Sequence, residues 1–211
     1  MTAGGPSVVV IDYGSGNLRS AERALAEVGA NVVVTSDMAA ARDADGVVLP
    51  GVGAFAACMA GIHDVGADDV VRQRVEAGHP VLGICVGMQV MYDGGREHGI
   101  RTPGIGVLSG NVVQLEADVL PHMGWDTVVP PPDSALFAGV EDERFYFVHS
   151  YAARAHDPSD AAGETVSEHG SRFVAAVESG VISATQFHPE KSGAAGLRLL
   201  KNWVAVVAAR S

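Results

Sequence analysis

Lysine, cysteine and long apolar runs are all scarce in this chain of 211 residues. Lys191 and Lys201 are its only lysines, and the formal net charge is −11. Nucleic-acid binding requires clustered basic side chains, so this composition excludes a phosphate-backbone partner. The two cysteines, Cys58 and Cys85, are too few for a disulfide framework and fit a reducing compartment.

Membrane and metal-binding signals are also missing from the sequence. No apolar stretch approaches the roughly 20 residues of a membrane span, so we predict no membrane association. The first residues lack a basic segment, and Ser7 to Ile11 is too short for the apolar part of a signal peptide. We therefore expect a cytoplasmic protein. The eight histidines show no metal-ligand spacing, and we predict neither a metal nor a cofactor.

The first ninety residues alternate between strand-like and helix-like segments. Ser7–Asp12, Asn31–Thr35 and Gly46–Leu49 are short β-branched apolar runs, which are typical of parallel strands buried on both faces. Leu18, Ala21, Leu25 and Val28 recur at helical spacing between the first two runs, and Val70 to Ala77 also indicates a helix. Repeated βα units predict an α/β fold with a mostly parallel sheet flanked by helices.

The pattern changes beyond Gly104. Short β-like segments separated by Gly, Pro and Asp predict an antiparallel extension in the C-terminal half, and a helix is expected from about Gly193. The β-like segments are 106–115, 125–129, 144–155, 165–168 and 172–178. The tripeptide Gly14-Ser15-Gly16 lacks both dinucleotide and Walker patterns, so we interpret it as a turn. We expect one domain over residues 1–211, because the candidate site draws on both halves.

Gly83-Ile84-Cys85-Val86-Gly87 is the most informative segment. It follows the apolar run Pro80–Leu82 and precedes a segment that can be helical, Met88 to Tyr92. Gly-x-nucleophile-x-Gly in this context makes a nucleophile elbow, here with cysteine in place of serine. The N–H groups at the start of the following helix favour the thiolate form. The alternative is that Cys85 is a small buried hydrophobic residue at a strand end.

A second segment, Thr185–Lys191, supplies the groups that a nucleophilic thiol needs. A thiol requires a base to take its proton, and the base requires a partner that fixes its tautomer. If the chain is extended here, His188 and Glu190 project to the same side, so both could face the site. Cys85, His188 and Glu190 therefore form a candidate triad of nucleophile, base and orienting carboxylate.

Pro50-Gly51-Val52-Gly53 follows a predicted strand, and could be an ordinary turn or part of an oxyanion hole. Acyl transfer from an amide places negative charge on the carbonyl oxygen, which aimed N–H groups stabilise. We assign one such group to Val86, next to the nucleophile, and the other to the loop around Val52 and Gly53.

Taken together, these motifs identify a resemblance. The chain resembles class I (triad) glutamine amidotransferases, and within them it is similar to the glutaminase subunits of imidazole glycerol phosphate synthases. The similarity spans nearly the whole sequence and departs from the family at Val86 and Val90, where leucine is frequent. The matching segments are 11–20, 49–55, 82–89, 121–125, 147–151, 186–192 and 197–202.

The resemblance implies an activity and a partner. The chain would hydrolyse L-glutamine to glutamate and ammonia through a cysteine thioester, and pass the ammonia to a (β/α)8-barrel cyclase subunit in histidine biosynthesis. Gln89 and Ser150 would contact the substrate glutamine, although a solvent-facing helical Gln is the alternative for Gln89.

The resemblance also implies an interface and a conformational change. Trp125, Tyr146 and Lys191 would lie at the contact with the cyclase, although the two aromatic residues would otherwise be placed in the core. In the family, the second oxyanion donor can require a peptide flip. Two other functions remain open: a glutaminase subunit of another synthase, such as those for anthranilate or pyridoxal phosphate, and a non-catalytic regulatory subunit on the same fold.

Overall fold

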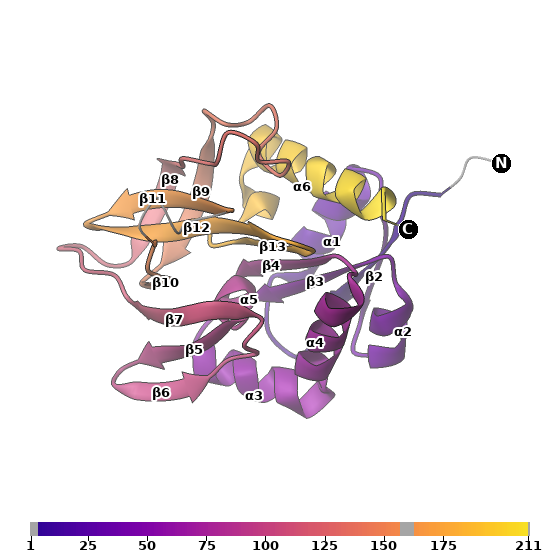
Figure 1. Ribbon diagram of the computed structural model, residues 1–211, viewed down its shortest axis with the longest axis horizontal. Coiled ribbons are helices and arrows are strands. Elements are labelled where there is room, and N and C mark those ends of the chain that lie inside the picture. The colour runs from indigo at the N-terminus through magenta and orange to yellow at the C-terminus, as the bar shows by residue number, and fades with distance from the viewer. Residues whose placement is uncertain (1–3, 157–162, 211) are drawn as a thin grey trace.

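A sheet of seven strands forms the centre of the molecule, in the order β11-β12-β13-β4-β3-β1-β2 (Figure 1). The computed structural model describes residues 4–156 and 163–210. The strands are β1 (Ser7–Ile11), β2 (Asn31–Thr35), β3 (Gly46–Gly51), β4 (Val81–Cys85), β11 (Glu164–His169), β12 (Ser171–Ser179) and β13 (Ile182–Thr185). Strands β2, β1, β3, β4 and β13 run parallel, and β11 and β12 continue the sheet in antiparallel fashion. The predicted α/β class is confirmed.

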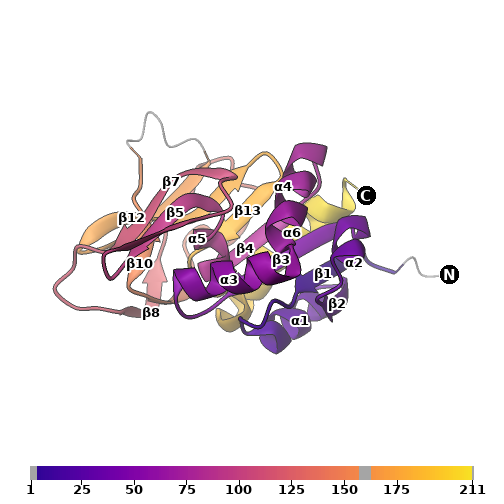
Figure 2. The ribbon, with the colours of Figure 1, turned by 90° about the horizontal axis from the view of Figure 1, so that it is seen from below.

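Helices cover both faces of this sheet, as Figures 1 and 2 show. On one face lie α1 (Leu18–Glu27) and α6 (Gly193–Ala208), which contact each other. On the other face lie α2 (Met38–Asp43), α3 (Phe55–Val65) and α4 (Ala67–Ala77). The strands between these layers are apolar and β-branched because both of their faces are covered. The carboxyl ends of β3 and β4 consequently meet at one edge of the sheet.

The remaining strands form the predicted extension. One sheet has the order β10-β7-β5-β6, and a separate hairpin pairs β8 with β9. These strands are β5 (Tyr92–Glu97), β6 (Ile100–Pro103), β7 (Leu108–Gln114), β8 (His122–Thr127), β9 (Arg144–His149) and β10 (Tyr151–Ala153). The pairing is antiparallel except between β5 and β7, which run parallel. The segment predicted as one strand over 144–155 is divided at Ser150.

The predicted helix over Met88 to Tyr92 is wrong. Helix α5 covers only Val86–Gln89, and β5 begins at Tyr92. Glycines at 94 and 95 disfavour continuation of a helix. Gly95 also packs against the ring of Phe55, where an added Cβ would come within 2.6 Å of a ring carbon. The chain therefore leaves the helix after one turn and enters the β5–β6 hairpin, which the sequence pattern did not indicate.

Two sets of buried side chains hold these layers together. The guanidinium of Arg74 on α4 is buried and donates hydrogen bonds to the carbonyls of Ala41, Arg42, Ala44, Asp45 and Pro80. A group of aromatic rings joins the extension to the central sheet, and its members are Phe137, Phe145, Phe147, Phe173 and Phe187.

Within residues 4–156 and 163–210, no helix has the length and apolar character required to cross a membrane.

Candidate active site

Cys85 is the last residue of β4, where the chain makes a sharp turn into α5. Its backbone has φ 56° and ψ −115°, a conformation that non-glycine residues rarely adopt. A Cβ at Gly87 would overlap the carbonyl oxygen of Leu49, and one at Gly83 would lie 2.9 Å from the Cα of Met88. Only glycines allow this close approach of backbone segments. The geometry is that of the predicted elbow, with Cys85 lining a pocket.

The electrostatic stabilisation of a Cys85 thiolate by the following helix is more local than the sequence predicts. Helix α5 has only four residues, so it carries little of the dipole that a long helix would accumulate. The N–H groups of its first turn still have no partner within the helix. Near the sulfur, these individual donors matter more than a summed helix dipole.

His188 and Glu190 lie side by side, as the candidate triad requires. His188 Nδ1 is 2.8 Å from Glu190 Oε1, and both side chains are 2% exposed. Nδ1 carries the proton in this contact because a carboxylate only accepts, which leaves Nε2 free for the thiol. The expected extended backbone is wrong, because Pro189–Lys191 forms a 3-10 turn that brings the carboxylate back to the ring.

The surroundings of His188 favour its protonated form. Burial on its own lowers the pKa of His188, but hydrogen bonds with Cys85 and Glu190, and their negative charges, outweigh burial and raise that pKa from 6.5 to about 9. The backbone of His188 is also held in place, since His188 N donates to Tyr146 O at 2.9 Å and Ser192 Oγ donates to His188 O at 2.7 Å. The imidazole is thus held between a thiol and a carboxylate.

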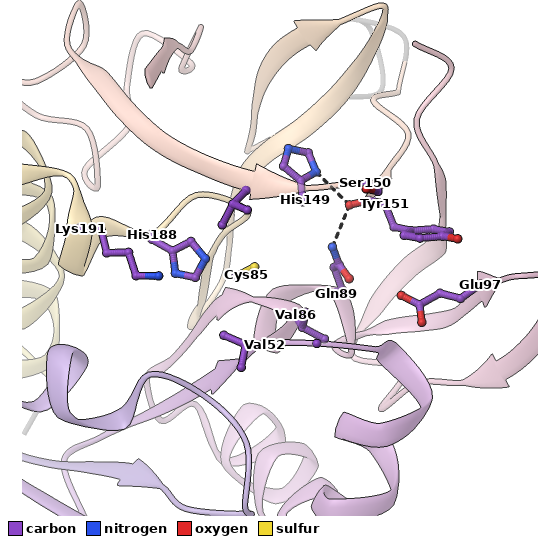
Figure 3. A pocket seen from close by; sticks show the side chains of 12 residues that line it. Val52, Cys85, Val86, Gln89, Glu97, His149, Ser150, Tyr151, His188 and Lys191 are labelled. Atoms are coloured by element: carbon purple, nitrogen blue, oxygen red, sulfur yellow. Dashed lines mark hydrogen bonds between the residues drawn. The ribbon is translucent and has the colours of Figure 1, made fainter. Parts of the chain in front are cut away.

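The loop that follows β3 lies directly beside the elbow. Gly51 pairs with Cys85 in the parallel register of β3 and β4. Val52 and Gly53 line the same pocket as Cys85 and Val86, and the Val52 side chain is 40% exposed at its edge (Figure 3). The structure therefore brings all three predicted oxyanion residues to the nucleophile. Their role as donors stays a prediction.

The pocket has a volume of about 250 Å³, enough for a small ligand of amino-acid size. Figure 3 shows His188 and Lys191 on one side of Cys85, and Gln89, Ser150 and Tyr151 on the other. The lining residues are Val52, Gly53, Cys85, Val86, Gln89, Glu97, Val148, His149, Ser150, Tyr151, His188 and Lys191. Both predicted substrate-contact residues, Gln89 and Ser150, belong to this set.

Gln89 is buried rather than solvent-facing. Its amide nitrogen donates to Tyr151 O at 2.8 Å and to Gln186 Oε1 at 2.9 Å, which leaves only its carbonyl oxygen for a ligand. Gln186 in turn points its amide nitrogen at Cys85 Sγ, 3.8 Å away. Sequence reasoning missed Gln186. Its position two residues before His188 could have indicated that it faces the site, because residues i and i+2 of an extended segment lie on the same face.

His149 forms part of the pocket wall. Its Nδ1 lies 3.0 Å from Tyr151 O and its Nε2 lies 3.0 Å from Nδ1 of His122. Burial, together with the nearby histidines, lowers the pKa of His149 to about 3, against a raising effect of the Tyr151 carbonyl. His149 therefore stays neutral at physiological pH and supports the wall that contains Ser150 and Tyr151.

Of the three residues predicted to contact a partner, Lys191 lines the pocket, and Trp125 and Tyr146 face each other on the paired strands β8 and β9. Trp125 on β8 is 52% exposed and pairs across the hairpin with Tyr146 on β9, with ring centroids 6.1 Å apart. Lys191 follows the triad and reaches the pocket lining. Met123, also on β8, is 66% exposed. The described part of the chain contains no group of three His, Cys, Asp or Glu side chains placed to hold a metal ion.

Comparison with known proteins identifies the family. The model of "Glutamine amidotransferase class-I" matches residues 9–207. This chain belongs to the class-I glutamine amidotransferase family. The match includes β4, the elbow at Cys85, the loop after β3 and the His188–Glu190 pair, so the family covers the whole candidate site.

Relatives of 54–57% identity are named "Imidazole glycerol phosphate synthase subunit HisH". The relative from Mycolicibacterium paratuberculosis is 57% identical over 94% of this chain and 97% of its own length. The relatives from Bifidobacterium longum and Thermobifida fusca are 55% and 54% identical, over 95% and 96% of this chain and 99% of each relative. These alignments extend over nearly the full length of every protein compared.

Solved structures share the fold at much lower identity. A structure described as a glutamine amidotransferase superposes with a TM-score of 0.71 at 19% identity, covering 95% of this chain and 98% of the other. A structure from Thermoplasma acidophilum, described as part of a putative GMP synthase, gives a TM-score of 0.67 at 20% identity, with coverage of 97% and 95%. At such identities these structures support the fold alone.

Proposed function

We propose that this chain is the glutaminase subunit of an imidazole glycerol phosphate synthase. It hydrolyses L-glutamine to glutamate and ammonia, and the ammonia is used in histidine biosynthesis. The observation that carries this function is the 54–57% identity to subunits of that name, over nearly the full length of both chains. The proposal extends to residues 1–211 as one amidotransferase domain acting in the cytoplasm without a cofactor.

The chemistry follows from the arrangement around Cys85. The surroundings of His188 favour its protonated form, so the thiol proton is held on Nε2 of His188 while the sulfur attacks the side-chain carbonyl carbon of glutamine. His188 then gives that proton to the leaving nitrogen, so that ammonia departs and a γ-glutamyl thioester remains on Cys85. A water molecule, deprotonated by His188, attacks the thioester, and the thiol leaves with that proton as glutamate forms. Glu190 holds the ring and stabilises its cation throughout.

Charge that develops on the substrate oxygen needs fixed donors. We assign one to the N–H of Val86, at the start of α5, and the other to the loop at Val52 and Gly53. Each such donor contributes about 3–4 kcal/mol to transition-state stabilisation in acyl-transfer enzymes. Support comes from the position of this loop beside Cys85 and from the shared lining of one pocket.

We place the substrate glutamine between Cys85 and the wall formed by Ser150 and Tyr151. The Gln89 carbonyl oxygen and polar groups of Ser150 can bind its α-amino and α-carboxylate groups. The amide of Gln186 keeps Gln89 in place, because it accepts one of the two Gln89 donors. The backbone of Ser150 is held by a hydrogen bond, in which Leu115 N donates to the Ser150 carbonyl at 3.0 Å.

The partner in this proposal is a cyclase subunit with a (β/α)8-barrel fold. Exposed Trp125 and Met123 on β8, with Tyr146 and Lys191 beside the pocket, would face this partner. Exposed apolar side chains of this kind are typical of protein contacts. A contact there would let ammonia pass directly from the pocket to the cyclase.

Reconstitution with the cyclase tests this function. The chain should support product formation from glutamine, and Cys85→Ala should support it only when ammonium is supplied instead. A glutaminase subunit of another synthase would fail to complement this cyclase but would complement its own synthase. A non-catalytic subunit would release no glutamate with any partner. Either outcome would overturn the proposal.

A further inference from the structure

Three side chains hold the back of the loop at Pro50–Gly53, on the side away from the pocket. Tyr13 donates its hydroxyl proton to Pro50 O at 2.6 Å. Ser15 Oγ donates to Val52 O at 2.8 Å, and Cys58 Sγ donates to the same oxygen at 3.3 Å. We call these three donors the carbonyl clamp. None of them lines the pocket at Cys85.

The clamp draws on two elements that are distant in sequence. Tyr13 and Ser15 lie in the connection between β1 and α1, whereas Cys58 lies in α3. Ser15 Oγ and Cys58 Sγ are 3.6 Å apart, so they approach the Val52 oxygen as neighbours. A carbonyl oxygen has two lone pairs, and here both are used. Rotation of the Val52 carbonyl would take the shared acceptor from both donors and leave them only their contact with each other.

The orientation of this carbonyl determines where the next N–H points. In a trans peptide the C=O and the following N–H point in opposite directions. Because Val52 O faces Ser15 and Cys58, the N–H of Gly53 faces the opposite side. Val52 and Gly53 line the pocket while Ser15 and Cys58 do not, which fits a Gly53 N–H on the pocket side.

We propose that Tyr13, Ser15 and Cys58 are positioning residues for the oxyanion loop: they fix the carbonyls of Pro50 and Val52, so that the N–H of Gly53 stays available to the substrate oxygen. This inference rests on the proposed glutaminase function. The clamp touches neither substrate nor nucleophile, and it acts on the transition state through Val52 and Gly53. Its loss therefore lowers kcat and leaves the KM for glutamine nearly unchanged.

Burial keeps the clamp groups protonated. It is the largest cause that raises the pKa of the Tyr13 phenol far above its ordinary value, and burial also raises the pKa of the Cys58 thiol. Both groups therefore remain donors at neutral and mildly alkaline pH. The clamp is a fixed part of the loop across the pH range in which a glutaminase works.

The kinetic test uses the chain in complex with its cyclase. Ser15→Ala should lower kcat for glutamine about fivefold to tenfold, with KM changed less than twofold. Cys58→Ala alone should stay within about twofold of wild type, because a thiol is a weak donor and Ser15 remains. The double variant should fall below Ser15→Ala. Ser15→Thr, which keeps the hydroxyl, should retain kcat, and Ser109→Ala on exposed β7 is the matched control.

A second measurement does not depend on activity. Amide hydrogen exchange over residues 50–54 should be faster in the double variant than in wild type and in Ser109→Ala, because the loop has lost its fixed carbonyl. Unchanged kcat together with unchanged exchange would overturn the clamp. If the wild-type complex released no glutamate, the proposed function would fail, while the exchange rates would still decide whether the clamp fixes the loop.

Discussion

Replacing Glu190 with Gln removes one charge from the triad and little else. The wild-type carboxylate accepts from His188 Nδ1 through Oε1 at 2.8 Å, and its side chain is 2% exposed. Within the described residues, the second carboxylate oxygen, Oε2, has no hydrogen-bond partner. A glutamine of the same size keeps one acceptor for the ring, so the imidazole can hold its orientation. What is lost is the negative charge opposite the imidazolium.

The expected loss follows from the strength of that contact. A buried hydrogen bond to a charged group contributes about 1.5–3 kcal/mol. If the whole of it is lost in the transition state, Glu190→Gln should lower kcat by about 10- to 150-fold. His188→Ala should be more damaging, because it removes the base and, with it, the activation of the thiol. The KM for glutamine should change little, since Glu190 does not line the pocket.

The pH dependence has a defined sign. The folded-state pKa of His188, about 9, lies above its ordinary value of 6.5. Its contribution to folding stability is therefore complete below 6.5 and is lost as the pH rises through about 9. Glu190→Gln removes one cause of the raised pKa, so the imidazole should titrate at lower pH. NMR titration of the His188 ring measures this shift directly.

Glutamate release by the complex with cyclase gives the kinetic side of the same experiment. Glu143→Gln is a matched control, because Glu143 is an exposed carboxylate in the loop before β9. It should leave kcat and the ring titration at their wild-type values. The reasoning is refuted if Glu190→Gln keeps kcat within about twofold of wild type and leaves the His188 titration where it was.

Three further outcomes follow from other parts of the structure. Arg74→Met should destabilise the fold by more than about 3 kcal/mol in urea unfolding, because it leaves five carbonyls, three of them in buried contacts, without this donor. The pKa of His149 is lowered to about 3 in the folded protein, so this side chain stays neutral at a pH below 6.5 at which the unfolded chain binds a proton. The free energy of unfolding should therefore fall as the pH drops from 6.5 to 3. His149→Gln should make this dependence of the free energy of unfolding on pH weaker. Trp125→Ala and Lys191→Ala should weaken stimulation of glutamine hydrolysis by the ligand-bound cyclase more than they change the basal rate.

The arrangement around Cys85 was predictable because it depends on local sequence. Glycines at 83 and 87 are required by the turn itself, and they stand next to the residue that they expose. The structure also places His188 in the pocket with Cys85, where a nucleophilic thiol requires a base, and its role as that base stays a prediction. The reason given for its contact with Glu190 was wrong: the pair meets through a 3-10 turn and not along an extended strand.

The features that were missed depend on contacts between distant segments. The spacing of Gln186 from His188 was a local signal, but its contact with Cys85 depends on the pairing of β13 with β4, since Gln186 directly follows β13. The β5–β6 hairpin was missed because apolar residues 88–92 fit a helix, while Gly95 packs against Phe55 from another element. Tyr13 was noted only within the family-matching segment 11–20, and Ser15 was interpreted as part of a turn. Their contacts with Pro50 and Val52 bridge 37 residues, which no local pattern reveals.

Trapping the covalent intermediate tests the central claim most directly. The complex with cyclase would be quenched in acid during glutamine turnover, digested and analysed by mass spectrometry. If Cys85 is the nucleophile, one γ-glutamyl group should be found on the peptide that contains Cys85 and none on the peptide that contains Cys58. A glutamyl group on Cys58, or steady glutamate release by Cys85→Ala, would contradict this claim.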